Sequence, residues 1–377
     1  MKKKKLAIFT VARSDFGILK NIILKCEKDK RFDLHLVIGS AHKSEIFGKT
    51  IKEINSIKIK KKIFFKFKYN QSSNQSIIKY FQKTLGEAEK FFKRNKIDAA
   101  LILGDRYEML AISIVCLNYN IPIMHFGGGS ITLGSLDNIY RYSISKMASA
   151  HFLETEHHKK NLQKIGINEN LNVVGSPSIE NVKFNFLKKK ELFKKLQLRF
   201  DTQKKIIIAC FHPETIHDKN YNIRNLKTFL SFLLKVNANL IITYPNADSG
   251  FNSYIKLIKK YLKKRKNSKI IKNLGSINYF SFLKISSLLI GNSSSGIIES
   301  ASFKIPTINI GERQKDRHAP NNVINSKFSL KDIIQSYRKA TSQKFISKLK
   351  NLKNPYFKKN VSSKSLDIIY KYLVKKT

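Results

Sequence analysis

The regular recurrence of short apolar runs is the feature that most constrains how this chain can fold. Runs rich in Val, Ile, Leu and Phe alternate with longer segments whose apolar residues are spaced three and four positions apart. Most runs are apolar on both faces, which is typical of parallel strands covered by helices on both sides. This alternation indicates βαβ units and open parallel sheets. The predicted strands are Leu6–Val11, Leu34–Ile38, Ala99–Leu103, Ile121–Phe126, Ala150–Leu153, Leu171–Val174, Lys205–Phe211, Ala238–Tyr244, Lys269–Ile271, Ser287–Ile290 and Pro306–Ile310.

Length and a restart of the strand pattern indicate two domains. The chain has 377 residues, which suffices for two domains of about 150 residues each. The strand series restarts after residues 175–177 and a Lys-rich segment. We therefore predict an α/β chain of two Rossmann-like parallel-sheet domains facing a cleft, residues 1–177 and 178–355. An amphipathic C-terminal helix, residues 356–377, follows and could pack on either domain.

The predicted strands also locate a candidate site, because ligands of open parallel sheets bind beyond the carboxyl ends of the strands. The chemically distinctive residues of this chain directly follow predicted strands. In a chain that uses Lys almost everywhere, five of the eleven Arg residues lie in these loops. Arg binds phosphate and carboxylate through a planar, bidentate fork, so this placement favours an anionic ligand. The five residues are Arg13, Arg106, Arg141, Arg313 and Arg317.

Arg13 and Ser14 follow the first predicted strand, in the segment Ala12–Gly17. A loop that enters a helix presents free backbone N–H groups to an anion, and Arg13 adds a bidentate donor. The alternative is a Ser or Asp residue that caps the helix beside a surface Arg. The turn lacks the G-x-G-x-x-G fingerprint, which disfavours NAD as a cofactor.

Asp105 and Arg106 follow the strand Ala99–Leu103. An acidic residue at the edge of a sheet acts as a general base when its surroundings raise its pKa. The alternative is an aspartate that caps the next helix. Three consecutive glycines, Gly127–Gly129, follow the next predicted strand, and they either bring the backbone close to a ligand or mark a flexible loop. Asp137, beyond these glycines, is a further candidate for proton transfer.

The second predicted domain carries polar loops after its strands. A histidine at such an edge binds a diphosphate or moves a proton. A loop of Gly and Ser ahead of a helix makes a phosphate cradle, and a glutamate one turn later can accept the two hydroxyls of a ribose. The loop Tyr244–Gly250 lies between the histidine and the Gly/Ser loop in the sequence. Its Pro and Gly residues are typical of turns, so this loop could be purely structural. The candidate residues are His212, Asn246, Ser293, Ser294, Glu299 and Arg313.

The formal net charge of +46 invites a nucleic-acid interpretation. Of the 72 basic residues, eleven are Arg, which leaves 61 Lys spread over the whole length. A nucleic-acid binder more often gathers basic residues on one element with a docking motif, and no zinc-finger or aromatic RNA-binding pattern is present. Lys-rich runs are then solvated faces of helices and loops. We predict no nucleic-acid partner.

Several other classes of protein are disfavoured. No apolar run approaches the roughly 20 residues that span a membrane, and the apolar run after the basic N-terminus is too short for a signal peptide. The three cysteines are far apart and unpatterned, which indicates neither a disulfide framework nor a zinc site. We expect a cytoplasmic protein without a membrane partner or a metal.

Taken together, these loops resemble those of the hydrolysing UDP-N-acetylglucosamine 2-epimerases, including the branch that serves sialic and nonulosonic acid synthesis. The resemblance runs from Arg13 to about Arg317. Its most specific parts are the segments YPNADSG, GNSSSGIIE and IPTINIGERQKDR, in that order. The resemblance implies a fold like the glycosyltransferase B type, a UDP-sugar or other NDP-sugar as substrate, no cofactor, and a homodimer.

The resemblance also implies a reaction and a division of roles. The nucleotide leaves C1 as the C2 proton is removed, which gives a glycal, and water then adds with C2 inverted. The first domain would hold the sugar and the second the nucleotide. The catalytic group would be Asp105, His212 and Asp137. Nucleotide or substrate would be bound by Arg13, Ser14, Arg106, Asn246, Ser293, Ser294, Glu299 and Arg313.

The glycine loop departs from the family pattern. Relatives carry acidic or histidine residues where this chain has Gly127 and Ser130, and an Asp-Asp pair where it has Asp137 and Asn138. The departure is consistent with a different sugar, a different division of labour that uses Asp105 and Asp137, or weakened catalysis. Two alternatives to the epimerase stay open. They are a glycosyltransferase of the same architecture and a non-catalytic sugar-nucleotide binder.

Overall fold

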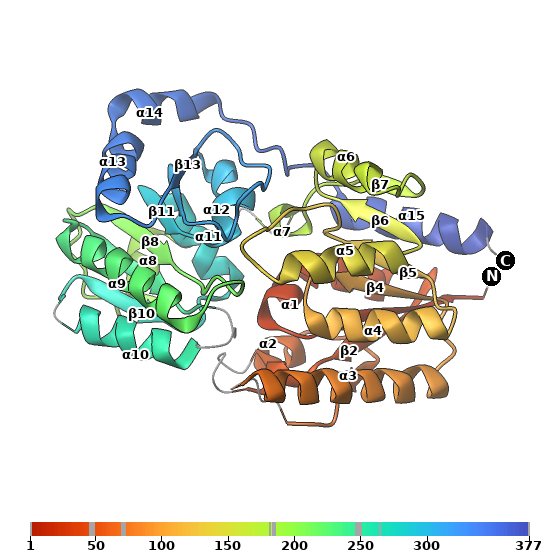
Figure 1. Cartoon of the computed structure of the whole chain (residues 1–377). Helices are drawn as coiled ribbons and strands as arrows, with labels where there is room; N and C mark the ends of the chain where they lie inside the picture. Colours follow the sequence, from red (N-terminus) through yellow and green to blue (C-terminus); the bar gives the residue numbers. More distant parts are fainter. Residues whose placement is uncertain are drawn as a thin grey trace. The chain divides into compact units, whose positions relative to one another are not determined.

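The structure is a computed structural model that describes residues 2–44, 50–68, 73–180, 182, 186–245, 251–263 and 265–375. For Arg13, Ser14 and Phe251 it describes the backbone and not the side chain. The chain divides into two compact units (Figure 1). Unit 1 comprises Met1–Ser130, Asp137–Asn181 and Tyr356–Thr377, and unit 2 comprises Ile131–Leu136 and Val182–Pro355.

Unit 1 is built on a parallel sheet that, among the described residues, has seven strands in the order β3-β2-β1-β4-β5-β6-β7. The strand order reverses beside β1, as in doubly wound folds. The strands are β1 (Lys4–Thr10), β2 (Phe32–Ile38), β3 (Lys62–Phe64), β4 (Ala99–Leu103), β5 (Ile123–Phe126), β6 (Ala150–Leu153) and β7 (Leu171–Val173). The helices are α1 (Arg13–Lys28), α2 (Ile51–Asn55), α3 (Asn74–Arg94), α4 (Tyr107–Asn118), α5 (Asp137–Met147), α6 (Glu156–Lys164), α7 (Pro177–Glu180) and α15 (Val361–Lys375).

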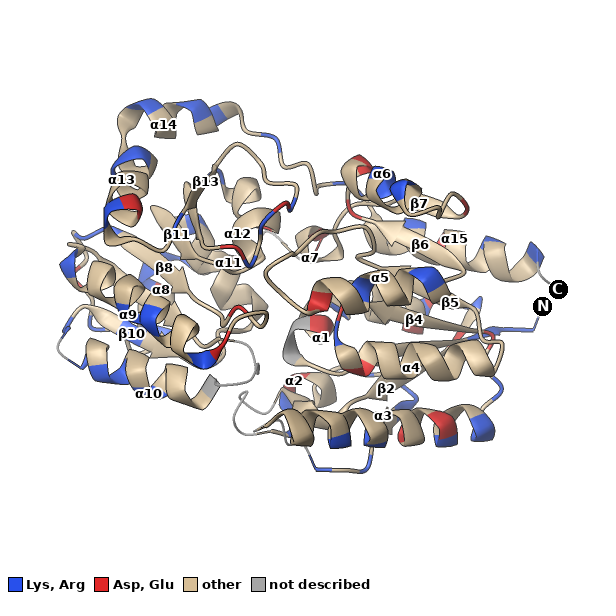
Figure 2. Cartoon of the chain, in the orientation of Figure 1, with Lys and Arg blue, Asp and Glu red and all other residues tan. Residues whose placement is uncertain are grey.

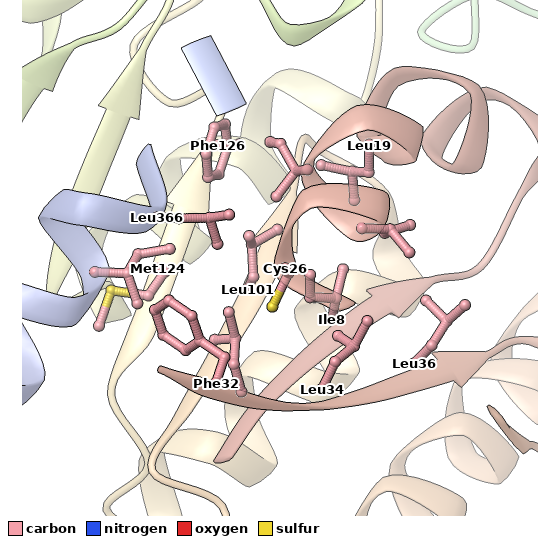
Figure 3. Close-up of a cluster of buried hydrophobic side chains, with 14 of the residues drawn as sticks. Ile8, Leu19, Cys26, Phe32, Leu34, Leu36, Leu101, Met124, Phe126 and Leu366 are labelled. Carbon is pink, nitrogen blue, oxygen red and sulfur yellow. The ribbon is translucent and has the colours of Figure 1, made fainter. Parts of the chain in front are cut away.

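Helices cover both faces of the unit 1 sheet, which explains why its strands are apolar on both sides. On one face α3, α4 and α5 bury Ala7, Phe9 and Ile102 of the strands. On the other face α1 and α15 pack over Leu6, Ile8 and their neighbours. Figure 3 shows this second cluster, in which Leu366 of α15 lies among side chains of α1 and the strands. The C-terminal helix is therefore part of the core of unit 1.

Unit 2 has a parallel sheet with six strands among the described residues, in the order β10-β9-β8-β11-β12-β13. The strands are β8 (Ile206–Cys210), β9 (Asn239–Thr243), β10 (Ser268–Ile271), β11 (Leu288–Gly291), β12 (Thr307–Ile310) and β13 (Val323–Ser326). The helices are α8 (Lys189–Lys195), α9 (Lys219–Lys235), α10 (Phe251–Leu262), α11 (Gly275–Ile285), α12 (Ser295–Ile298), α13 (Leu330–Thr341) and α14 (Gln343–Lys348).

The unit 2 sheet, like that of unit 1, has a hydrophobic core on each face. Helices α9, α10 and α13 cover one face, and α8 and α11 cover the other. The predicted fold class, two Rossmann-like parallel-sheet units, is confirmed. The predicted boundary after residue 177 falls inside unit 1, because the short helix α7 packs against α1 and α15.

Charge is spread over the molecule. Figure 2 shows Lys and Arg on helices and loops of both units rather than concentrated on one element. Within the described residues, no helix is long and apolar enough to span a membrane. The three cysteines are all buried thiols.

Candidate functional site

In unit 1 the first polar loop joins β1 to α1 and is organised by Asp15. Its carboxylate accepts the backbone N–H groups of Val11 and Ala12 at 2.9 and 2.8 Å. These two donors are therefore taken by the protein rather than by an anion. Burial raises the pKa of Asp15, and the nearby charge of Arg106 offsets part of that rise.

The second loop of unit 1 follows β4, where Gly104 has a φ of +81° and turns the chain sharply. The carboxylate of Asp105 forms an ion pair with the guanidinium of Arg141, which also donates to the carbonyl of Ser130 at 2.9 Å. The Arg141 side chain is 2% exposed and that of Asp105 is 31% exposed. A buried cation thus fixes a carboxylate that stays accessible at the carboxyl edge of the sheet.

Arg106 is held from one side by Glu108. Its Nε and Nη2 donate to the two carboxylate oxygens at 3.1 and 2.8 Å, and Glu108 is fully buried. Burial opposes the charge on Arg106, but Glu108 outweighs this effect and keeps the pKa of the guanidinium above its usual value. Arg106 therefore stays protonated and ties the start of α4 in place.

The glycine loop after β5 is anchored by His125, which is fully buried. Its Nε2–H donates to the carbonyl of Gly104 at 2.8 Å, and its Nδ1 accepts the hydroxyl of Ser145 at 3.2 Å. Burial lowers the pKa of His125 to about 3, so the ring is neutral. His125 therefore joins the loops after β4 and β5 through its hydrogen bonds, and it does not act as a general acid at neutral pH.

Gly127 and Gly129 have φ angles of +82° and +73°. A Cβ atom on Gly129 would lie 2.1 Å from the carbonyl oxygen of His158. Asn161 donates to the carbonyl of Gly129 at 2.8 Å. Backbone contacts therefore leave no room for a side chain at Gly129, whereas a Cβ on Gly127 would lie 3.7 Å from its nearest neighbour, an ordinary contact, and only the positive φ favours glycine there.

In unit 2, His212 follows β8 and is held through its backbone by Asn292. Its N–H donates to Asn292 Oδ1 at 2.7 Å, and Asn292 Nδ2 donates to its carbonyl at 2.9 Å. The Nε2 atom of the ring lies 3.2 Å from Cys210 Sγ. Asn292 stands in the loop after β11, so one side chain aligns two of the predicted site loops.

The loop after β11 begins at Gly291, with a φ of +138°. A Cβ atom there would lie 1.7 Å from the carbonyl oxygen of Cys210, so only glycine fits. Ser293 and Ser294 are half-buried, and Glu299 is 9% exposed directly after α12. Ser293 and Ser294 thus follow the carboxyl end of β11, and Glu299 follows α12. The phosphate cradle stays a prediction.

The loop after β12 carries Arg313, which is buried. Its backbone N–H and that of Glu312 both donate to one carboxylate oxygen of Glu214, at 3.0 and 2.7 Å. Gln314 donates to the carbonyl of Asn292 at 3.0 Å. The loops after β8, β11 and β12 therefore form one hydrogen-bonded group.

The segment Ile131–Leu136 also belongs to unit 2. The N–H of Leu136 donates to the hydroxyl of Thr215 at 3.1 Å. A Cβ atom on Gly134 would lie 2.6 Å from both N and Cα of Arg313. This segment of the β5–α5 connection therefore packs directly on the loops that carry His212 and Arg313.

Most of the predicted site residues fall into two groups, one at the carboxyl edge of each sheet. Unit 1 holds Asp105 and Arg106, with Asp137 at the start of α5. The side chains of Arg13 and Ser14, and the whole of Asn246, lie outside the described parts of the chain. In unit 2, hydrogen bonds join the loops that carry His212, Ser293 and Arg313, while Ser294 and Glu299 flank α12, the helix that follows β11.

Three residues that organise the site were given no role from the sequence. Arg141 stood out only as one of the rare arginines, and it lies in α5, 36 residues from its partner Asp105. Asn292 lies inside the GNSSSGIIE segment, but nothing local reveals its bonds to His212. Glu214 is next but one to His212, while its backbone partners lie 98 and 99 residues away.

Solved structures with this fold define the class of protein. UDP-GlcNAc 2-epimerase from Neisseria meningitidis bound to UDP-GlcNAc matches with a TM-score of 0.79 at 19% identity, over 98% of this chain and 100% of that chain. The Methanocaldococcus jannaschii UDP-GlcNAc 2-epimerase in complex with UDP-GlcNAc and UDP matches with a TM-score of 0.79 at 20% identity, over 97% and 99%. The shared architecture is that of two-domain, glycosyltransferase B-like proteins.

The particular family follows from sequence. The family model described as UDP-N-acetylglucosamine 2-epimerase matches residues 24–370, and the chain belongs to this family. A Campylobacter jejuni protein named GDP/UDP-N,N'-diacetylbacillosamine 2-epimerase (hydrolyzing) is 40% identical over 92% of this chain and 89% of its own length. The Escherichia coli polysialic acid biosynthesis protein P7 is 32% identical over 99% of this chain and 95% of its own length.

Proposed function

We propose that the chain is a hydrolysing 2-epimerase of nucleoside-diphosphate-linked 2-acetamido sugars that serves surface-glycan or nonulosonic acid synthesis. The observation that carries this proposal is the Asp105–Arg141 ion pair at the carboxyl edge of the unit 1 sheet. It supplies a fixed, accessible carboxylate, which is the proposed acceptor of the C2 proton. Family membership supports the reaction class.

The proposed reaction balances in two steps. In the first, Asp105 takes the proton from C2 of the sugar, the C2–H electrons form a C1=C2 double bond, and the C1–O bond to the diphosphate breaks. In the second, water adds its hydroxyl to C1, a proton reaches C2 from the opposite face, and Asp105 releases the first proton to the solvent. The products are a free 2-epimerised sugar and a nucleoside diphosphate.

In this proposal unit 2 binds the nucleotide. The hydroxyls of Ser293 and Ser294 and the guanidinium of Arg313 are the donors for the diphosphate, and Glu299 is the acceptor for the ribose hydroxyls. His212, whose backbone is fixed by Asn292, is the proposed group that stabilises the leaving diphosphate. Arg13, Ser14, Arg106 and Asn246 complete the proposed nucleotide and substrate contacts, and Asp137 is the candidate for the second proton transfer.

The named relatives narrow the substrate class. The Campylobacter jejuni relative is named for GDP- or UDP-linked N,N'-diacetylbacillosamine, and a Legionella pneumophila relative, 28% identical over 90% of this chain, for the UDP-linked form of that sugar. The residues Gly127 and Ser130 also differ from the family pattern on the proposed sugar side. We therefore propose a diacetamido sugar as the first substrate to test and UDP-N-acetylglucosamine as the second.

Proton NMR of purified protein with each nucleotide sugar tests the proposal. We expect signals of a free sugar with C2 inverted, together with an equal amount of nucleoside diphosphate. A GDP-linked and a UDP-linked form of the same sugar, run side by side, identify the nucleobase. Failure of every substrate in this panel at high enzyme concentration would refute the assignment.

The glycine loop favours one alternative, a glycosyltransferase of the same architecture. Gly127–Ser130 contains no carboxylate, and such a loop can admit an acceptor hydroxyl in place of water. Release of nucleotide that depends on an added glycan acceptor would identify this activity. The proposed epimerase releases nucleotide with water alone.

The assembly and the compartment are further parts of the proposal. We propose a homodimer that acts in the cytoplasm. Light scattering on the purified chain measures the mass of the assembly in solution, and fractionation of cells that produce it locates the protein. A monomeric mass at the concentration of the activity assay would contradict the dimer.

A further inference from the structure

Glu214 is a fully buried carboxylate that joins two loops of the proposed nucleotide site. One of its oxygens, Oε1, accepts the backbone N–H groups of Glu312 at 2.7 Å and of Arg313 at 3.0 Å. Glu214 itself lies two residues after His212. A single side-chain oxygen of Glu214 thus connects the backbone of Arg313 to the loop that carries His212, and both are candidate nucleotide-binding residues.

The Glu214 side of this connection is held rigidly by Asn222. The N–H of Glu214 donates to Asn222 Oδ1 at 2.8 Å, and Asn222 Nδ2 donates back to the carbonyl of Glu214 at 3.0 Å. The hydroxyl of Tyr254 donates to Asn222 Oδ1 at 3.1 Å. Because Asn222 lies in α9 and Tyr254 in α10, the carboxylate is mounted on the body of unit 2.

The Arg313 side is pressed against the carboxylate. Gly311 has a φ of +81°, and a Cβ atom there would lie 2.5 Å from Oε1 of Glu214 and 2.2 Å from the ring of Phe328. Gly134 also approaches this backbone, since its Cβ would lie 2.6 Å from both N and Cα of Arg313. The backbone of Arg313 therefore has one position in which all of these contacts are made.

Stability alone does not require a carboxylate at this place. Burial of an ionised group is costly, and an apolar side chain of similar volume often serves as well or better. Burial raises the pKa of Glu214, and the two backbone N–H groups counteract that rise. What a carboxylate adds is two directional, charge-assisted hydrogen bonds, which are shorter and stronger than neutral ones.

We propose that Glu214 is a positioning residue that fixes the backbone of Arg313, so that its guanidinium meets the diphosphate of the nucleotide sugar. This inference rests on the proposed function of the same site. In this role Glu214 touches no substrate. It acts through Arg313, so its loss weakens nucleotide binding more than it slows the chemical step.

Variants of Glu214 test this role with two readouts, the kinetic constants for the nucleotide sugar and the calorimetric Kd for UDP and GDP. Glu214→Leu removes both acceptor bonds, and we expect KM and Kd to rise about 10- to 100-fold while kcat changes little. Glu214→Gln keeps a carbonyl oxygen at Oε1 and should restore most of the affinity. The matched control is Glu312→Ala, because the Glu312 side chain is 52% exposed and its N–H is retained.

A double-mutant cycle distinguishes positioning from general destabilisation. Arg313→Ala removes the guanidinium that is proposed to bind the diphosphate. Adding Glu214→Leu to that variant should therefore change Kd only slightly. If Glu214→Leu does not fold, Glu214→Asp carries the test, since its shorter side chain draws the oxygen away from both N–H groups. An unchanged KM and Kd in Glu214→Leu or Glu214→Asp, or full additivity with Arg313→Ala, overturns the inference. Wild-type protein that neither binds nucleotide nor turns over any sugar refutes the proposed function instead.

Discussion

At the scale of single residues, Asp105 is central, and Asp105→Asn tests its role. The amide keeps one oxygen for Arg141, so the surrounding loops should stay in place, but it cannot take a proton from carbon. We expect kcat to fall by about 10²- to 10⁴-fold, with little change in the Kd for the nucleotide. Steady-state kinetics and calorimetry on the same preparation measure both quantities.

Asp98→Asn is the matched control for this substitution. Asp98 is exposed just before β4, at the amino edge of the same sheet, where its carboxylate accepts the N–H of Lys5 at 2.6 Å. We expect wild-type kcat from this variant. Asp105→Asn with undiminished kcat would remove Asp105 from the proposed chemistry.

Residue-scale prediction from sequence depends on local rules. Gly291 and the serines after it are predicted to meet a ligand because loops after parallel strands carry ligand-binding residues, and in the structure they do lie at the carboxyl end of β11. Such local rules do not predict the ion-pair partners of Arg106 and Asp105. Arg106 pairs with Glu108 two residues on, but only the fold places Arg141 beside Asp105. Long-range pairing of side chains is decided by tertiary packing, which a single sequence does not display.

At the scale of elements, the turn at the carboxyl end of β11 requires a glycine. Gly291→Ala would place Cβ 1.7 Å from the carbonyl oxygen of Cys210, at a φ of +138°. The backbone must then shift, and we expect the free energy of unfolding to fall by about 3 kcal/mol or more. Urea denaturation followed by circular dichroism measures the change.

Gly86→Ala serves as the control for that experiment. Gly86 lies inside α3, where an added Cβ would find open space, with no atom of the described neighbours within 4 Å. Alanine favours a helix by about 0.5–1 kcal/mol over glycine, so this variant should be slightly more stable than the wild type. Equal loss of stability in both variants would show that the turn at the carboxyl end of β11 is not specially constrained.

A second element-scale prediction concerns α15. Leu366 is buried in the core of unit 1 (Figure 3), so Leu366→Ala should lower the free energy of unfolding by about 2–5 kcal/mol. Val374 on the same helix is 48% exposed, and Val374→Ala should change the free energy of unfolding by less than about 0.5 kcal/mol. Denaturant titration of both variants decides the matter, and similar values would mean that α15 is not part of the core.

Elements with long apolar runs were predicted from sequence, and two short strands were not. β3 lies in a Lys-rich stretch that was interpreted as a solvated face, and its three residues are all only half-buried. β13 is four residues long, and its last two residues, Asn325 and Ser326, are polar. Edge strands of this kind bury little surface, so their sequences carry a weak apolar signal. Their pairing with β2 and β12 is a property of the assembled sheets.

At the scale of the whole molecule, buried histidines predict how stability depends on pH. Burial lowers the pKa of His42 and His151 to about 4 and that of His125 to about 3, from an ordinary value of 6.5. Below pH 6.5 the unfolded chain binds protons that the folded chain does not. These groups therefore contribute full stability above pH 6.5 and lose it as the pH falls toward 4.

Two buried carboxyls act in the opposite sense. Burial raises the pKa of Asp15 and of Glu214, so their contribution to stability improves as they gain protons at lower pH. We expect the histidines to dominate and the free energy of unfolding to fall from pH 6.5 to near pH 4. Urea titrations across this range measure it. A flat or rising profile would show that the three rings are not held neutral.

The proposed enzyme inverts C2 of a nucleotide-linked sugar by removing and replacing the proton on that carbon. The most direct test is to run the reaction in D₂O with the preferred nucleotide sugar and to examine the free sugar by NMR and mass spectrometry. We predict one solvent deuterium at C2, inverted configuration at that carbon, and one nucleoside diphosphate released for each sugar. A free sugar that keeps its original C2 configuration and carries no deuterium there would contradict the claim.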